Sequence, residues 1–142
     1  MSDLVVVRQQ GRFAEIELNN PAKRNAISWE LGQALLRALD TVAASDARAV
    51  LIRGAGPVFS SGIDLGDLMA LPERYGERWQ RQMRAITDDW QRLTTRLERL
   101  EIPTIALLHG AALGLAFEIA LACDFRIAVT STKLGLPETR LG

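Results

Sequence analysis

The stretch that decides the fold is "HGAALGLAFEIALACDFRIA", residues 109–128. It overlaps an apolar run, "TIALLHGA" at 104–111, which predicts a buried strand. "GLAFEIALAC" then predicts a short apolar helix that begins near Gly114 or Leu115, and "DFRIAV" predicts a further strand. Strand, helix and strand in this order are typical of an α/β fold.

Two glutamates near this stretch are candidates for acid–base chemistry. Glu118 falls in the first turn of the predicted helix, among apolar neighbours, and a buried carboxylate is costly unless it is paired or used. The alternative is a solvent-facing glutamate that complements the helix dipole. Glu138 follows the turn "LGLP", and its alternative is a surface-loop glutamate. Two such carboxylates beside glycine-rich corners suggest proton transfer at carbon.

The upstream segments extend the same alternation. "LVVVRQQGRFAEIELN" at 4–19 predicts a β-hairpin with its turn near Gly11, and Ser28 is a predicted N-cap of a helix over 28–45. "AVLIRGA" at 49–55 predicts a buried strand. A helix is predicted over 73–100, either packed on the sheet or forming a seam for a partner helix. Its apolar stripe comprises Trp79, Met83, Ile86, Trp90, Leu93, Leu97 and Leu100.

Composition excludes several classes of protein. The chain has 142 residues, 48% hydrophobic and 24% charged, which suits one soluble domain spanning 1–142. Lys plus Arg and Asp plus Glu number 17 each, so a nucleic-acid binder that relies on positive charge is not expected. No run is long enough to cross a membrane, and the N-terminus "MSDLVVVRQQ" predicts no signal peptide. One His and one Cys predict no metal site.

Two corners between a strand and a helix are candidate anion sites. Ser60, Ser61 and Gly62, in "VFSSGIDL", follow the strand 49–55, and Gly114 precedes the short helix. Small residues let a ligand approach the backbone, and free N–H groups at such corners bind anions or oxyanions. An ordinary tight turn explains the first corner equally well. If the two corners lie together, they supply the two converging donors that an enolate oxygen needs.

Other polar residues have simpler expected roles. His109 is expected to bond loop backbone, and Asp64 and Asp67 to cap a helix start. Cys123 is expected to be a buried, inert thiol. Lys23 and Arg24 are expected to be solvated, with contact to a phosphate as the alternative.

Four motifs, in order, resemble those of the crotonase superfamily, the enoyl-CoA hydratase/isomerase family. They are "NPAKRNAIS", "GAGPVFSSGIDL", "HGAALGLAFEIALACDFRIA" and "GLPETRLG". The resemblance implies a crotonase-like spiral of β-β-α units that binds acyl-CoA. It covers nearly all 142 residues but implies only the N-terminal part of the fold, truncated before the C-terminal helices, because family members run to roughly twice this length.

The resemblance also assigns site residues. The backbone N–H groups of Ile63 and Leu115 would hold the thioester oxygen, and Glu118 and Glu138 would be the catalytic pair, at the family's usual separation. The "GLA" at 114–116 replaces a frequent "GGG", so Leu115 and Ala116 are expected to narrow the space beside the thioester. The substrate and its CoA part would contact a larger set: Ala22, Lys23, Arg24, Ala26, Ser61, Gly62, Asp64, Leu65 and Gly114.

The glutamate pair favours an enoyl-CoA hydratase, a lyase of fatty acid metabolism that adds water across the 2,3 double bond. The carboxylates are expected to share one small pocket and to titrate as a coupled pair. A dienoyl-CoA or enoyl-CoA isomerase is the first alternative, and a non-catalytic acyl-CoA-binding or oligomerising remnant is the second. Leu68, Met69, Leu71 and the helix 73–100 are expected to wall the acyl pocket.

The family also implies the protein's surroundings. The expected partner is an acyl-CoA thioester, with coenzyme A entering as part of the substrate and no separate cofactor. Neither nucleic acid nor a membrane is expected as a partner. A homo-oligomer, trimer or hexamer, in the cytoplasm is expected.

Overall fold

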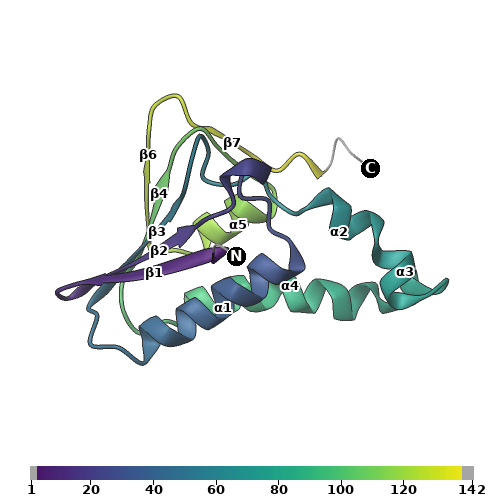
Figure 1. The fold of residues 1–142 in the computed structure, drawn as a ribbon, viewed down its shortest axis with the longest axis horizontal. Coiled ribbons are helices and arrows are strands. Elements are labelled where there is room, and N and C mark those ends of the chain that lie inside the picture. Colours follow the sequence, from purple (N-terminus) through teal and green to yellow (C-terminus); the bar gives the residue numbers. More distant parts are fainter. Residues whose placement is uncertain (1–2, 139–142) are drawn as a thin grey trace.

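The computed structural model describes residues 3–138, which form two β-sheets and several helices (Figure 1). The strands are β1 (Val5–Gln10), β2 (Phe13–Leu18), β3 (Ala49–Gly54), β4 (Thr104–Leu108), β5 (Ala111–Leu113), β6 (Phe125–Ala128) and β7 (Lys133–Gly135). The helices are η1 (Pro21–Lys23), α1 (Trp29–Ala43), α2 (Leu65–Met69), α3 (Leu71–Tyr75), η2 (Trp79–Gln82), α4 (Met83–Glu98) and α5 (Leu115–Leu121), where η marks a 3-10 helix. The predicted α/β class is confirmed.

The first unit is a hairpin followed by a helix. β1 and β2 pair antiparallel around a turn at Gly11, whose φ of 61° suits glycine. Ser28 then caps α1, because its Oγ accepts a hydrogen bond from the N–H of Leu31 at 3.1 Å. Glu30 in the first turn complements the helix dipole. The predicted hairpin, helix and cap are therefore confirmed.

The larger sheet has the strand order β1-β2-β3-β4-β6. β2–β3, β3–β4 and β4–β6 are parallel pairs. Each parallel neighbour is reached through a crossover that contains helix: α1 first, then α2 to α4, then α5. Figure 1 shows α1, α4 and α5 gathered on one side of this sheet.

A second layer of short parallel pairings runs beside the larger sheet. β5 pairs with β7, Ser60 bridges Ala112 within β5, and Ile27 bridges Ile63. Successive turns of the chain therefore add a strand to the larger sheet and a short extended segment to the second layer. This repeat is the spiral of β-β-α units that was expected.

The core lies between the larger sheet and α1, α4 and α5. The alternating apolar residues of β2 face inward, and the stripe of α1 packs on them because its period matches one helix face. Burial of this stripe supplies most of the stability of such a helix. The largest fully buried side chains are Phe59, Ile16, Leu18, Ile27, Leu31, Leu35, Leu39, Ile52, Leu93, Leu97, Ile119 and Val42.

The prediction of one helix over 73–100 is wrong, because the segment is divided. α3 ends at Tyr75, because Gly76 has a φ of 79° and a ψ of 177°, a backbone conformation that cannot continue a helix. η2 follows, and α4 then carries the apolar stripe, of which Ile86, Leu93 and Leu97 are buried while Met83 is exposed. Within residues 3–138 no helix has the length and apolarity to cross a bilayer.

β6, predicted as a strand, is the edge strand of the larger sheet. Phe125, Ile127 and the following Val129 are all more than half exposed and alternate along one face. Asp124 ties this edge to β4, because its carboxylate accepts hydrogen bonds from the N–H and Oγ of Thr104 at 2.8 and 2.9 Å. These bonds, the backbone one above all, lower the pKa of Asp124.

Candidate active site

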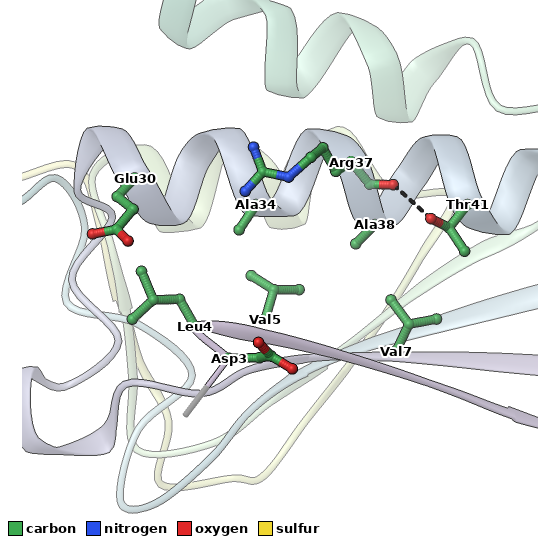
Figure 2. Close-up of a pocket in the computed structure, with 9 residues that line it drawn as sticks. All are labelled: Asp3, Leu4, Val5, Val7, Glu30, Ala34, Arg37, Ala38 and Thr41. Carbon is green, nitrogen blue, oxygen red and sulfur yellow. Dashed lines mark hydrogen bonds between the residues drawn. The ribbon is translucent and has the colours of Figure 1, made fainter. Parts of the chain in front are cut away.

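Two large hollows in the molecule differ in what lines them. A groove of about 670 Å³ lies between β1 and α1, where Figure 2 shows Val5 and Val7 facing the helix that carries Arg37 and Thr41. The one hydrogen bond drawn there joins the Thr41 hydroxyl to the carbonyl of Arg37 within the helix, at 2.9 Å. None of the residues that the sequence marks for chemistry lines this groove.

The second hollow, of about 630 Å³, collects most of the sequence-predicted site residues, and we call it the central cavity. It lies where η1, the start of α2, the Gly114 corner and the segment after β7 meet. Its lining is Lys23, Ala26, Ser61, Gly62, Ile63, Asp64, Leu65, Gly66, Leu68, Gly114, Pro137 and Glu138. The structure thus brings together residues that lie more than a hundred positions apart in the sequence.

The first corner, residues 60–63, is held by a buried polar network. Asn25 is fully buried, and its Nδ2 donates to the carbonyl oxygens of Ala55, Val58 and Phe59 at 2.8, 3.0 and 3.1 Å. The hydroxyl of fully buried Ser60 donates to the Asn25 carbonyl at 2.7 Å. Satisfied buried networks of this kind fix one backbone arrangement, because any rearrangement leaves polar groups unpaired.

This network leaves one backbone donor of the first corner free. The Gly62 N–H donates a hydrogen bond to the Ser60 hydroxyl oxygen, 3.2 Å away. The bridge to Ile27 uses the Gly62 carbonyl and the Asp64 N–H, at 2.7 and 3.0 Å. The N–H of Ile63, between them, donates to no group in residues 3–138. It belongs to a residue that lines the central cavity.

The second corner places another free donor beside the first. The N–H of Gly114 bonds the Gly135 carbonyl at 2.9 Å, which continues the β5–β7 pairing up to the start of α5. Leu115 is the first residue of α5, so its N–H is one of the groups that a helix leaves without an internal partner. It has no acceptor in the described part of the chain.

The two corners touch through glycine. Gly62 has a φ of 94°, and a Cβ built on it would overlap the Leu113 carbonyl and approach Gly114. Only glycine tolerates both the conformation and this separation. The two corners therefore lie together, which was the condition for two converging donors, and the N–H groups of Ile63 and Leu115 belong to neighbouring segments.

Glu138 lies against the second corner. A Cβ on Gly114 would overlap the Glu138 carboxylate, so that carboxylate lies directly over the glycine that precedes Leu115. Glu138 is itself exposed, and it lines the central cavity. Across the cavity Lys23 forms an ion pair with Asp64 at 3.6 Å, and the Lys23 side chain is largely exposed.

Of the two alternatives for Glu118, a buried carboxylate and a solvent-facing one, the structure has the second. Its flanking residues Leu115, Ala116, Ile119 and Ala120 are buried, but Glu118 is exposed. A short helix packs one face on the core, and Glu118 lies off that face although its sequence neighbours do not. Glu118 also is not among the residues that line the central cavity, so the shared pocket expected for the two glutamates contains Glu138 alone.

The expectation that Leu115 and Ala116 narrow the site is also wrong. Both side chains are buried in the core, and neither lines the central cavity. Two residues expected at the CoA end, Ala22 and Arg24, are likewise absent from the lining. Arg24 contributes through its backbone instead, since its carbonyl accepts a hydrogen bond from the Ser61 N–H at 3.0 Å.

The simpler predicted roles are confirmed. Asp64 caps α2, accepting from the N–H groups of Gly66 and Asp67 at 2.8 and 3.3 Å. Asp67 instead accepts from the N–H of Trp29 at the start of α1. His109 bonds loop backbone through its Nε2 and the Gly56 carbonyl, 2.9 Å apart.

Cys123 is a buried free cysteine, as predicted. Burial in apolar surroundings raises its pKa to about 11, which keeps the thiol protonated and unreactive near neutral pH.

Asn25 is the residue of this corner to which the sequence analysis assigned no role, whereas Ser60 was among the small residues marked there. Asn25 lies in the motif "NPAKRNAIS", and its side chain holds the first corner in place. A usable signal was present: asparagine tolerates left-handed backbone, and Asn25 has a φ of 51° beside Arg24 at 52°. The partners of its amide are thirty or more residues away and could not be inferred.

Comparison with known proteins points in one direction. The profile of the family described as enoyl-CoA hydratase/isomerase matches residues 8–142. An enoyl-CoA isomerase/hydratase of Mycosarcoma maydis is 36% identical over 135 residues, 88% of this chain and 47% of that protein. The mitochondrial Δ(3,5)-Δ(2,4)-dienoyl-CoA isomerase of Mus musculus is 31% identical over 142 residues, 96% of this chain and 43% of that protein.

Solved structures agree with the sequence comparison. The crystal structure of an enoyl-CoA hydratase from Thermoplasma volcanium superposes with a TM-score of 0.88 at 29% identity. The match covers 99% of this chain and 54% of that one. The chain therefore spans about half the length of the relatives it matches.

Proposed function

The chain belongs to the enoyl-CoA hydratase/isomerase family, and from that premise we propose that it acts as an enoyl-CoA hydratase. The proposed reaction adds water across the 2,3 double bond of an enoyl-CoA thioester. The observation that carries the proposal is the pairing of two free backbone donors, at Ile63 and Leu115, with a carboxylate over the intervening corner.

The two donors account for activation of the substrate. An enoyl thioester is attacked at Cβ when its carbonyl oxygen can accept negative charge, and donors already in place lower the energy of the resulting enolate. Because the Asn25 network fixes the first corner, its donor needs no reorganisation as charge develops. Removing one donor of an oxyanion hole typically costs about 10²- to 10³-fold in rate.

The glutamates account for the protons. In the proposed step one carboxylate takes a proton from water as the water oxygen bonds to Cβ, and a protonated carboxyl delivers a proton to Cα. Glu138 is proposed for one of these roles because its carboxylate lies over Gly114. Glu118 is proposed for the other because it lies one turn along α5 from Leu115, with its N–H bonded to the Gly114 carbonyl at 3.0 Å.

The direct test is hydration of a short trans-2-enoyl-CoA, followed as loss of the conjugated thioester absorbance. We expect turnover by the 142-residue chain and a loss of about 10²-fold or more in Glu118→Gln and in Glu138→Gln. Both glutamates are exposed, so neither substitution should unfold the protein. Glu98→Gln, at the end of α4 and outside the cavity, is the matched control.

The result that would contradict the proposal is also specific. Absence of turnover by a folded protein that binds the substrate would remove hydratase activity. Normal turnover by one glutamate variant would remove that residue from the mechanism but leave the reaction standing.

An isomerase is the second candidate, favoured by the 31% identity to the dienoyl-CoA isomerase of Mus musculus. Moving double bonds requires the same enolate stabilisation and proton transfer, without attack by water. A 3,5-dienoyl-CoA substrate distinguishes the two reactions. Its conversion to the 2,4-dienoyl-CoA product, without addition of water to the acyl chain, would favour the isomerase.

The CoA end is proposed to lie along η1. Lys23 and Ala26 line the central cavity, and the exposed ammonium of Lys23 can meet a phosphate by exchanging its contact with Asp64. Self-association and a cytoplasmic location remain part of the proposal.

A further inference from the structure

Arg126 in β6 takes no part in the proposed chemistry, but its side chain reaches the helix that carries part of that chemistry. It stands opposite Ala106 of β4 in the parallel register, and Ala106 is fully buried. Residues that are paired in this way point to the same face of a sheet, so Arg126 lies on the face that the helices cover. Figure 1 shows α5 on that face.

The Arg126 guanidinium binds the end of α5. Its Nη1 donates to the carbonyl oxygens of Ala120 and Leu121, both at 3.2 Å, and to that of Cys123 at 2.6 Å. The last carbonyls of a helix have no partner within the helix, and they form the negative end of its dipole. A cation that donates to these carbonyls therefore stabilises the end of the helix and fixes where that end lies.

The turn between α5 and β6 is attached to the sheet as well. The Asp124 carboxylate accepts from the N–H and the hydroxyl of Thr104 in β4, and the Asp124 N–H donates back to that hydroxyl at 2.9 Å. Arg126 follows two residues later, in a strand that is itself paired with β4. The guanidinium therefore connects the end of α5 to a part of the larger sheet that is held by several hydrogen bonds.

The start of α5 has a weaker attachment. The Gly114 N–H bonds the Gly135 carbonyl at 2.9 Å, which extends the pairing of β5 with β7. These strands have three residues each and form a sheet of two strands, and pairings of that size are marginally stable by themselves. Because α5 has only seven residues, it moves as one piece, and the contact at its end helps to decide where its first residue lies.

We propose that Arg126 is a positioning residue of the active site and acts through α5. By fixing the end of this helix it fixes the N–H of Leu115 and, one turn further on, the carboxylate of Glu118. The inference rests on the proposed function, which gives those two groups their roles. Hydrogen bonds weaken steeply when their geometry is lost, and a displacement of about 1 Å in a catalytic group can lower a rate about 10²-fold.

Infrared difference spectroscopy of a bound, unreactive thioester tests the Leu115 donor without relying on turnover. The probe is butyryl-CoA with an isotope-labelled thioester carbonyl. Two N–H donors polarise this carbonyl, so we expect its band to move to lower wavenumber when the wild type binds it. In Arg126→Met the shift should fall by about half, because one of the two donors is displaced. The Kd of the probe should stay within about twofold.

Turnover of a short trans-2-enoyl-CoA gives the second measurement. In Arg126→Met we expect kcat to fall about tenfold and KM to stay within about twofold, because the proposed CoA contacts along η1 do not involve α5. Arg126→Lys retains the charge and N–H donors at the end of α5, so it should recover part of the band shift and part of kcat. Arg96→Met is the matched control and should change neither, since Arg96 contacts Asp40 of α1, at 2.9 Å.

A folded Arg126→Met protein with the wild-type band shift and kcat would overturn the inference and leave the proposed function intact. If circular dichroism shows that this variant does not fold, Arg126→Lys decides: a partial shift supports the inference and a full shift overturns it. A wild type that shifts the band without hydrating the enoyl-CoA, with a smaller shift in Arg126→Met, would support the inference and remove the hydratase. A wild type that binds the probe with no shift would overturn both.

Discussion

The two corners of the site supply similar donors by different means. The first corner is fixed by buried side chains, Asn25 and Ser60, whose bonds stay inside the protein. The second corner is fixed by backbone pairing to β7 and is overlain by the exposed side chain of Glu138. The N–H of Ile63 is therefore held rigidly by buried side chains, whereas the N–H of Leu115 lies beside an exposed side chain that can rotate. This contrast predicts that matched substitutions will damage stability at the first corner and activity at the second.

Gly62→Ala should have the largest effect. Its Cβ would meet the backbone carbonyl of Leu113, which cannot swing aside, and its φ of 94° is strained for alanine. We expect a loss of about 3 kcal/mol or more in the free energy of unfolding, and little remaining turnover. Urea denaturation measures the first and the enoyl-CoA assay the second. Gly76→Ala is the control, since its φ is 79° but nothing lies within 4 Å of the added atom.

Gly114→Ala should separate activity from stability. The added Cβ meets the Glu138 side chain, whose flexible end can rotate away. Stability should therefore fall by about 1 to 3 kcal/mol, the cost of a φ of 54° with a ψ of −129° for alanine, while turnover falls about 10²-fold because the carboxylate is displaced. The same two measurements apply. Equal stability losses at Gly62 and Gly114 would remove the contrast between the corners.

Asn25→Ala tests the network behind the first corner. Truncation leaves the carbonyls of Ala55, Val58 and Phe59 without their shared donor, so we expect a loss of about 2 kcal/mol. Turnover should fall as well, because the Ile63 donor loses its support. Asn19→Ala, which removes only an exposed hydrogen bond to the Asp3 carbonyl, is the matched control and should cost a few tenths of a kcal/mol.

Raising the pH should lower the free energy of unfolding through the buried thiol of Cys123, without any substitution in the site. Cys123 follows α5, and burial raises its pKa from 9.0 to about 11, so the unfolded chain loses this proton first. The free energy of unfolding should fall progressively between about pH 9 and 11, by at most about 2 kcal/mol. Thermal melts of the wild type and Cys123→Ala, compared across this range, measure it. Identical slopes would contradict the assignment.

The sequence was sufficient for the elements whose signals are local. The hairpin around Gly11, the cap at Ser28 and the apolar face of α1 depend on residues a few positions apart. The division of the predicted 73–100 helix was missed because apolar spacing continues from Trp79 onward while Gly76 alone marks the break.

The site shows the same limit. Its two corners were identified from glycine and small residues, but the sequence left the burial or exposure of Glu118 open, since composition around one residue does not reveal which side of a short helix it occupies. The Asn25 contacts span thirty residues or more, and only the folded chain brings their partners together.

The parallel ladder also sets an order of events during folding. The β1–β2 hairpin and α1 form from residues that are close in the sequence. The β2–β3, β3–β4 and β4–β6 pairs form only after a long intervening loop has closed, which costs chain entropy. Chains dominated by such distant pairings fold in milliseconds to seconds. The corners need β5 and β7, which pair across the last of these loops. We therefore expect the hairpin to form early and the two corners of the site to be among the last parts of the protein to assemble.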